Sequence, residues 1–431
     1  MNIADALAYL DAHAGYDKTG RIEHPSLDRI SRLVEAMGDP QDAAPVIHVT
    51  GTNGKGSTAQ IITQLLVAHG LTVGTFTSPH LERVNERICR DNEPISDEDL
   101  ADQVGAVVDL ALVTGVEPSY FDIVTACAFR WFADVAVDVV VLEVGLLGRW
   151  DATNVADARV AVVTNVGMDH LEFAGPTLAH VAAEKAGIIK PDSTLVLGET
   201  DAALAAIFRA AGAAHVVERE IDFECIENQL ALGGRKLDIR TPKATYTDLF
   251  LPLHGRHQGD NAACALAAVE EFFDARLDRE VVEEGFAAVR WPGRFEVLGH
   301  QPLVIVDGAH NPAGADACAQ VMDDDFDPAG KRIVVVGFLQ GRDPGQMLSA
   351  LRVDEADLIV CCTPPSGRGL PASDVAAAAR DMGCENVLVV PSVDKACDAA
   401  LAQAGADDAV LVTGSLYVVG AARAHLIKAL P

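Results

Sequence analysis

The chain has 431 residues, of which 49% are hydrophobic and 22% charged, a balance that is typical of globular proteins with more than one core. Its formal net charge of −30 argues against nucleic acid or an anionic membrane as a partner, because a negative field repels phosphate. No apolar run approaches the roughly 18 residues of a membrane span, and nine scattered cysteines without a Cys-x-x-Cys pair indicate reduced thiols in the cytoplasm.

The first 200 residues alternate short β-branched runs with segments of helical spacing, which is typical of a parallel sheet. Residues 1–17 lack a basic start and predict an amphipathic helix instead of a signal peptide. Val46–Thr50 predicts a strand, Ser57–His69 a helix and residues 71–76 a second strand, together a βαβ unit. The nearly continuous apolar runs at 137–145 and 160–167 predict two more strands, each covered on both faces.

The segment Gly51–Ser57, GTNGKGS, joins the first predicted strand to the following helix. Glycines let successive backbone N–H groups point at phosphate oxygens, and a helix N-terminus adds partial positive charge. Lys55 would reach the β- and γ-phosphates, and the Ser57 hydroxyl would touch phosphate or its Mg²⁺. The segment is shorter than the usual phosphate-binding loop, and Gly56 separates Lys55 from Ser57. A ligand-free glycine turn is the alternative, and a lysine at this position argues against it.

Glu143 ends the strand predicted at 137–145, and His170 follows the next strand. Ligands gather at the carboxyl ends of parallel strands, the edge from which the phosphate loop also leaves. A carboxylate and an imidazole beside a triphosphate suggest a divalent cation, Mg²⁺ or Mn²⁺. Taken singly, Glu143 could be an ion-paired carboxylate and His170 a loop residue without a role. Their joint placement carries the prediction of a metal site.

The second half of the chain begins with a change of pattern, because residues 223–253 alternate and turn like short antiparallel strands. A helix is predicted at 258–273 and a linker near 291–299. Five apolar runs separated by helix-sized segments then predict a Rossmann-like sheet. The expected fold is α/β, with a P-loop parallel-sheet ATP-binding domain at 1–296 that includes the antiparallel portion and a Rossmann-like domain at 297–431.

Two further segments carry candidate site residues. Lys185 lies in a predicted helix, where a surface lysine is the simpler interpretation. The segment Asp307–Pro312, DGAHNP, ends the first strand of the second domain and opens a helix. Its Asp, His and Asn could face the crevice, and a helix N-cap is the alternative role for Asp307.

Taken together, the motifs resemble those of folylpolyglutamate synthases, including the bifunctional dihydrofolate synthases, within the Mur ligase superfamily. They appear in order along nearly the whole chain: GTNGKGS, TSPHL (77–81), ERI (86–88), EVGLLGRWDATN (143–154), EKAGI (184–188), GRHQGDNA (255–262), WPGRFE (291–296), DGAHNP and TGSLY (413–417). The resemblance implies that ATP phosphorylates a folate carboxylate and that the amine of glutamate attacks the acyl phosphate. Such chemistry demands mainly positioning and neutralisation of charge.

The resemblance also implies roles for particular residues, with Lys55, Lys185 and His310 as catalytic groups. ATP would be bound by Gly51, Thr52, Asn53, Gly54, Lys55, Gly56, Ser57, Asn261, Arg294 and Asp307. Mg²⁺, with Mn²⁺ or K⁺ as alternatives, would be held by Ser57, Ser78, Glu143 and His170. Lys185 would be carbamylated, and His310 and Ser415 would seat the incoming glutamate. The pteroate pocket would be lined by Tyr120, Phe121, Asp122, Trp150, Asp151 and Ala152.

Asp151 matches an aspartate of the bifunctional members and favours dihydropteroate as an additional acceptor. Two positions depart from the family: Leu147 replaces a more usual glycine, and Gln340–Asp343 lacks the commoner lysine. The rival interpretations are a Mur ligase of peptidoglycan precursors, which would place Thr directly after the loop lysine, and a P-loop regulatory ATPase, which would need no glutamate. The expected partners are small molecules, with neither nucleic acid nor membrane, and the expected state is a monomer.

Overall fold

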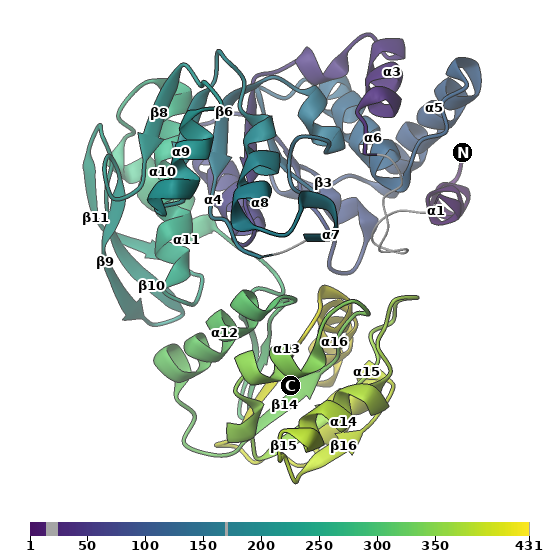
Figure 1. The fold of residues 1–431 in the computed structure, drawn as a ribbon, viewed down its shortest axis with the longest axis vertical. Coiled ribbons are helices and arrows are strands. Elements are labelled where there is room, and N and C mark those ends of the chain that lie inside the picture. The colour runs from purple at the N-terminus through teal and green to yellow at the C-terminus, as the bar shows by residue number, and fades with distance from the viewer. Residues whose placement is uncertain (14–24, 169–170, 431) are drawn as a thin grey trace. The chain divides into compact units, whose positions relative to one another are not determined.

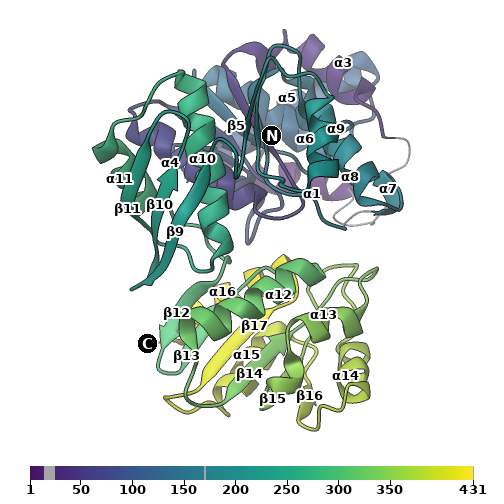
Figure 2. The same ribbon diagram turned by 60° about the vertical axis from the view of Figure 1, so that its left-hand side comes forward.

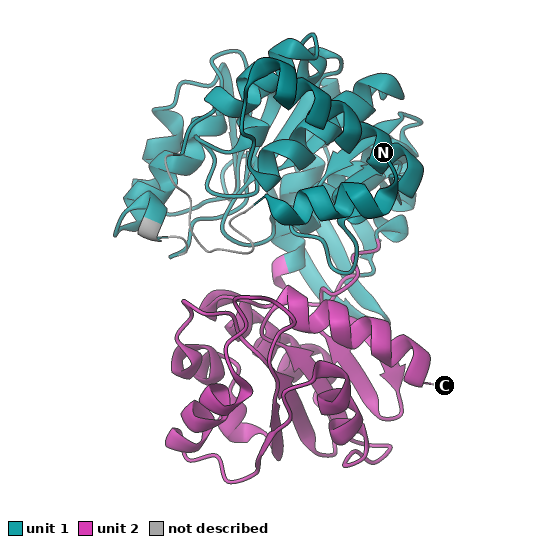
Figure 3. Cartoon of the chain, turned by 90° about the vertical axis from the view of Figure 1, so that its right-hand side faces the viewer, with its two compact units in different colours: residues 1–252, 258–289 teal, residues 253–257, 290–431 magenta. Residues whose placement is uncertain are grey.

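The computed structural model describes residues 1–13, 25–168 and 171–430, and those residues contain three β-sheets. They divide into unit 1, residues 1–252 and 258–289, and unit 2, residues 253–257 and 290–431 (Figure 3). Within the described ranges, no helix is long and apolar enough to cross a membrane. The predicted α/β class is confirmed.

Unit 1 is built on an eight-stranded sheet of order β4-β3-β2-β5-β1-β6-β7-β8. Figure 1 labels β3, β6 and β8 of this sheet. Its strands are β1 (Val46–Thr50), β2 (Val73–Phe76), β3 (Ile88–Arg90), β4 (Glu93–Pro94), β5 (Val139–Glu143), β6 (Ala158–Val163), β7 (Thr194–Leu197) and β8 (His215–Glu218). The six longer strands run parallel, and β3 and β4 add an antiparallel edge. Strand β1 has the predicted bounds, and the carboxyl ends of β1, β2, β5 and β6 share one edge.

The central strands of this sheet are buried along their whole length because helices cover both of its faces. On one face, Val46 and Leu142 pack with α5 and α6, and Ala161 and Val163 pack with α8 and α9. Helix α4 contacts β1, β2 and β5. The helices are α1 (Ile3–Ala12), α3 (Asp28–Ala36), α4 (Lys55–Ala68), α5 (Asp97–Thr114), α6 (Tyr120–Asp134), α7 (Leu171–Ala174), α8 (Leu178–Lys185), α9 (Ala202–Arg209), α10 (His257–Phe273) and α11 (Arg279–Ala288).

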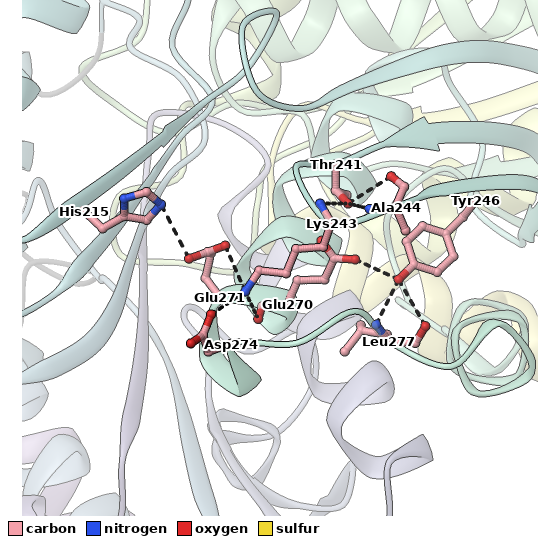
Figure 4. Close-up of polar contacts among 9 residues, drawn as sticks. All are labelled: His215, Thr241, Lys243, Ala244, Tyr246, Glu270, Glu271, Asp274 and Leu277. Atoms are coloured by element: carbon pink, nitrogen blue, oxygen red, sulfur yellow. Dashed lines mark hydrogen bonds and ion pairs between the residues drawn. The ribbon is translucent and has the colours of Figure 1, made fainter.

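The predicted antiparallel portion is a three-stranded sheet of order β11-β10-β9, which Figure 2 shows beside α10 and α11. Its strands are β9 (Glu224–Ala231), β10 (Gly234–Arg240) and β11 (Thr245–Leu251). Tyr246 joins it to α10, since its hydroxyl lies 2.7 Å from Glu270 Oε1 (Figure 4). The same hydroxyl accepts a hydrogen bond from the Leu277 N–H at 3.0 Å, and Lys243 pairs with Asp274 at 2.8 Å. The sheet is therefore fixed to the helix by the buried hydrogen bonds of Tyr246 and by an exposed ion pair between Lys243 and Asp274.

Glu270 provides a test of this packing, because its side chain is fully buried and burial raises the pKa of its carboxyl. The folded protein then binds the proton more tightly than the unfolded chain, so this contribution to stability is present at acidic pH and lost as pH rises. Glu270→Gln keeps a hydrogen-bonding partner for Tyr246 and removes the ionisation. We expect the melting temperature of the variant to rise relative to the parent protein between pH 4.5 and pH 8. A difference that does not change with pH would contradict the raised pKa.

Unit 2 contains a six-stranded sheet of order β12-β13-β17-β14-β15-β16, parallel except for β12. The five predicted apolar runs form β13 (Leu303–Val306), β14 (Arg332–Val336), β15 (Leu358–Cys361), β16 (Val387–Val389) and β17 (Ala409–Thr413). The helices are α12 (Pro312–Val321), α13 (Pro344–Ala350), α14 (Ala372–Asp381), α15 (Val393–Leu401) and α16 (Leu416–Ala429). The linker prediction was wrong in its second half, because Glu296–His300 forms the antiparallel edge strand β12.

Candidate functional site

The loop Gly51–Ser57 runs from the end of β1 into the first turn of α4, as predicted. Gly54 has φ 81°, a conformation that favours glycine, and a Cβ there would lie 2.3 Å from Asn261 Oδ1. A Cβ on Gly51 would lie 1.8 Å from Thr164 Oγ1. Both positions favour glycine because a Cβ would meet the side chain of Asn261 or Thr164, and Asn261 of α10 therefore borders the loop.

Thr164 and Asn165, which directly follow β6, hold the loop in place, and the sequence analysis did not identify them. The N–H groups of Thr52 and Asn53 donate to the backbone oxygen and to Oδ1 of Asn165, each at 3.0 Å. The Thr164 hydroxyl donates to the Asn53 carbonyl at 2.6 Å. Their position directly after a predicted strand, at the edge that holds the loop, is the signal that could have revealed them. The loop is thus preorganised by β6 as well as by its own glycines.

Two lysine amines converge on the start of the loop. Lys55 Nζ donates to the carbonyls of Gly51 at 3.1 Å and Thr52 at 3.2 Å, and Lys185 Nζ donates to Gly51 at 2.7 Å. Lys185 is only 3% exposed, which excludes the interpretation as a surface lysine. Two cations at a turn that already presents a helix N-terminus make a site suited to an anion.

Glu143 ends β5 and is buried beside the loop edge. Its Oε2 accepts the Ser78 N–H at 3.0 Å, and β2 and β5 pair in parallel, so both residues lie at the carboxyl edge. Oxygen donors of this kind fit a hard divalent cation. Phosphate oxygens would supply the remaining ligands of such a cation. Among the residues that the structure describes, no cluster of three His, Cys, Asp or Glu forms a metal site by itself. His170 lies outside the described residues.

The loop after β5 brings together several of the predicted acceptor residues. A Cβ on Gly145 would lie 2.4 Å from the Phe121 ring and 3.1 Å from Asp151 Oδ2, so these groups are neighbours. Trp150 is half exposed and Ala152 is buried. An exposed indole next to a buried carboxylate offers a stacking surface and a hydrogen-bond acceptor for a flat heterocycle.

Asp151 is held firmly within this group. Its Oδ2 accepts the Leu146 N–H at 2.8 Å, and its Oδ1 accepts the N–H and the hydroxyl of Thr153 at 3.1 and 2.5 Å. Burial raises the pKa of Asp151 to about 6, although these hydrogen bonds oppose the rise. The carboxyl group is therefore mostly ionised at neutral pH.

Tyr120 and Asp122 have other contacts at the start of α6. The Asp122 carboxylate accepts the N–H and hydroxyl of Ser119, which caps the helix, and pairs with Arg29 Nε at 3.0 Å. The Arg87 guanidinium lies over the Tyr120 ring at 5.3 Å. Asp122 thus has a clear structural role in capping, whereas Phe121 is the residue of this trio that adjoins Asp151.

Leu147, the departure from the family pattern, has φ 57°, which favours glycine and which strains other residues by about 1 kcal/mol. Its carbonyl accepts the Thr50 hydroxyl at 2.6 Å. The loop keeps the backbone shape of a glycine-containing turn even though leucine occupies the position.

In unit 2, the segment DGAHNP follows β13 as predicted. Asp307 accepts the N–H groups of Phe295 and Ala309, each at 2.9 Å, and Arg294 donates to the Gly308 carbonyl at 3.3 Å. The N-cap of α12 is Asn311, so the alternative that Asp307 caps this helix was wrong. Asp307 and Arg294 are thereby brought together.

His310 and Ser415, the two residues expected to seat glutamate, also lie in unit 2. His310 contacts the Gly308 carbonyl through Nδ1 at 3.0 Å. Ser415 is buried and caps α16 by accepting the Val418 N–H at 3.2 Å. Both lie after strands of the parallel sheet, the edge at which ligands gather.

Comparison with known proteins identifies both units. Residues 121–269 match the Mur ligase middle domain, and residues 293–416 match the Mur ligase glutamate ligase domain. A Mycobacterium tuberculosis protein named dihydrofolate synthase/folylpolyglutamate synthase is 39% identical over 93% of this chain and 89% of its own length.

Solved structures agree with these matches. The M. tuberculosis folylpolyglutamate synthase complexed with ADP and AMPPCP has a TM-score of 0.91 and 37% identity, covering 98% of each chain. A bifunctional folylpolyglutamate synthase/dihydrofolate synthase with Mn, AMPPNP and L-glutamate bound has a TM-score of 0.86 and 29% identity, covering 99% of this chain and 98% of that one. The sequence and the fold of this chain are thus both similar to those of folylpolyglutamate synthases.

Proposed function

Because this chain belongs to the folylpolyglutamate synthase/dihydrofolate synthase family of Mur ligases, we propose that it joins L-glutamate to the carboxylate of folates. It is an ATP-dependent amide ligase. ATP transfers its γ-phosphoryl group to the acceptor carboxylate, ADP leaves, and the glutamate amine displaces phosphate to form the amide.

The observation that carries the proposal is the convergence of Lys55 and Lys185 on the Gly51 carbonyl, with Glu143 at the same sheet edge. Lys55 neutralises charge on the transferring phosphoryl group, and the loop N–H groups that are not bound to Asn165 orient its oxygens. Asn261, which borders Gly54, would contact the nucleotide. For Arg294 and Asp307 of unit 2, nucleotide contacts are proposed from the resemblance to the family. Carbamylation of Lys185 would replace one of these two positive charges with an anion able to orient the acceptor, and Lys55 would remain the cation at the loop.

The divalent cation that we propose is Mg²⁺, because oxygen donors and phosphates suit it best. Ser57, Ser78, Glu143 and His170 would hold it, and it would neutralise charge on the phosphates. Ser78 and Glu143 are already linked by a hydrogen bond, so the protein fixes the direction of the carboxylate in advance. His310 and Ser415 seat the incoming glutamate.

For the acceptor, we propose dihydropteroate in addition to folates. Asp151 supports this assignment, because an ionised carboxylate accepts hydrogen bonds from the amino and ring N–H groups of a pterin. Phe121 adjoins Asp151, and the indole of Trp150 offers a stacking face. The enzyme would act as a monomer in the cytoplasm, where its nine free cysteines stay reduced.

The direct test follows ADP release by purified protein with Mg²⁺ and ATP. We expect release only when a pteroate or folate acceptor and L-glutamate are both present, because the acyl phosphate turns over only when the amine arrives. Mass spectrometry of the product should show one added glutamate residue. Equal turnover on a muramyl-peptide precursor, or ADP release that ignores glutamate, would contradict the proposal.

A further inference from the structure

A chain of buried hydrogen bonds connects Asp151 to the strand that carries the phosphate loop. The Thr153 hydroxyl lies 2.5 Å from Asp151 Oδ1, and His48 Nε2 of β1 lies 2.8 Å from the same hydroxyl. Thr153 and His48 are fully buried, and Asp151 is 5% exposed. None of the roles proposed above involves Thr153 or His48.

The direction of these bonds follows from counting hydrogens. A hydroxyl has one hydrogen, and the Thr153 hydroxyl donates it to the carboxylate, which can only accept when ionised. The hydroxyl must then accept from His48, so His48 carries its proton on Nε2. Burial first, and the charge of Lys190 second, lower the pKa of His48 to about 3, so the ring is neutral. Its Nδ1 has no hydrogen-bond partner, which is acceptable only for a neutral ring in an apolar setting.

This arrangement does more than a helix cap requires. As N-cap of the short helix Ala152–Val155, Asp151 needs only the backbone N–H of Thr153, and that bond is present at 3.1 Å. The additional hydroxyl and imidazole support the ionised form of the carboxylate and fix its rotation about Cα–Cβ. Oδ1 accepts two hydrogen bonds from Thr153, and Oδ2 accepts the Leu146 N–H and lies beside Gly145 and Phe121.

We propose that Thr153 and His48 are positioning residues, which hold Asp151 as an oriented carboxylate for the donor edge of the pterin ring. This inference rests on the proposed function, because it specifies how that acceptor is recognised. Neither residue touches the acceptor itself. Their effect should therefore appear in acceptor affinity and its pH dependence, and not in ATP binding.

The experiment measures the dissociation constant of dihydropteroate by quenching of tryptophan fluorescence, from pH 5 to pH 9. Thr153→Val removes the hydroxyl at nearly constant volume, and Thr153→Ser keeps it. We expect about tenfold weaker binding for the valine variant, the usual loss for a hydrogen bond to a charged group, and near-normal binding for serine. The affinity of ATP should be unchanged in both variants.

The pH dependence separates positioning from general damage. The Thr153 hydrogen bonds lower the pKa of Asp151 against the effect of burial, so their loss should move the acidic limb of the binding curve to higher pH. Asp151→Asn should remove this limb. His48→Gln, which retains a donor near the place of Nε2, should bind better than His48→Leu; Lys190 near His48 is left unchanged in all variants.

Two results would overturn the inference. One is equal affinity for Thr153→Val and Thr153→Ser, and the other is a valine variant whose acidic limb coincides with that of the parent protein. If the valine variant fails to fold, the pair of His48 variants decides by the same comparison. If the parent protein binds no dihydropteroate at all, this inference fails, whereas glutamate-dependent ADP release with tetrahydrofolate would still support the proposed ligase.

Discussion

Replacement of Lys55 by alanine is expected to reduce glutamate-dependent ADP release at least about a hundredfold, equivalent to about 2.7 kcal/mol of transition-state stabilisation. Lys55 lies at the first turn of α4, and its amine already reaches the Gly51 and Thr52 carbonyls. Alanine keeps the helix and the glycine turn while removing the charge that we propose neutralises the transferring phosphoryl group. Initial rates with saturating acceptor and glutamate provide the measurement.

The control for this variant is Lys236→Ala in β10, which removes an exposed lysine of the same unit that pairs with Asp248. It should retain full activity. If Lys55→Ala keeps turnover within tenfold of the parent protein, about 1.4 kcal/mol, the phosphate-binding role of the loop is wrong.

Glu143→Gln is expected to have the second large effect, a loss of about a hundredfold in rate together with a higher Mg²⁺ requirement. Glutamine preserves the shape of the side chain and an oxygen that accepts the Ser78 N–H, so the edge of the sheet stays folded. What disappears is the negative charge that a divalent cation needs from its protein ligand. Titration of activity with Mg²⁺ at fixed ATP gives the measurement.

Glu283→Gln is the matched control, because Glu283 is an exposed carboxylate of α11 paired with Arg279. Its Mg²⁺ titration should superimpose on that of the parent protein. A Glu143→Gln curve with the same midpoint and plateau as this control would remove Glu143 from the metal site.

Most of the fold was predictable because its strands are short, apolar and separated by helices. Val46–Thr50 and the parallel runs of unit 2 needed only local periodicity, and both were confirmed. The edge strand β12 escaped prediction because Trp291, Pro292 and Gly293 interrupt the pattern just before it. Its pairing with β13 is a tertiary contact, and such contacts leave a weak trace in a single sequence.

The candidate site divides in the same way. Gly51–Ser57 and Glu143 were predictable, because the local sequence is enough to recognise a glycine-rich turn and a carboxylate at the end of a strand. Thr164, Asn165 and Thr153 were not, because their partners are more than a hundred residues away or depend on how β1 lies between β5 and β6. Lys185 was assigned a role only by resemblance, because its local pattern is that of a surface lysine, and the fold shows that it is buried.

One face of β1 has a wider consequence. His48 and Thr50 are two residues apart, so they point to the same side of the sheet, and each binds the segment that follows β5. The strand that leads into the glycine turn therefore also fixes the segment that carries Asp151, the residue that we propose for acceptor recognition. In a directed-evolution search for new acceptors, changes at His48 would alter the segment after β5, whereas the nucleotide turn keeps its own hydrogen bonds to Thr164 and Asn165. Such a search would target Phe121 and Trp150, which we propose for the acceptor pocket and which make none of the bonds that support the turn.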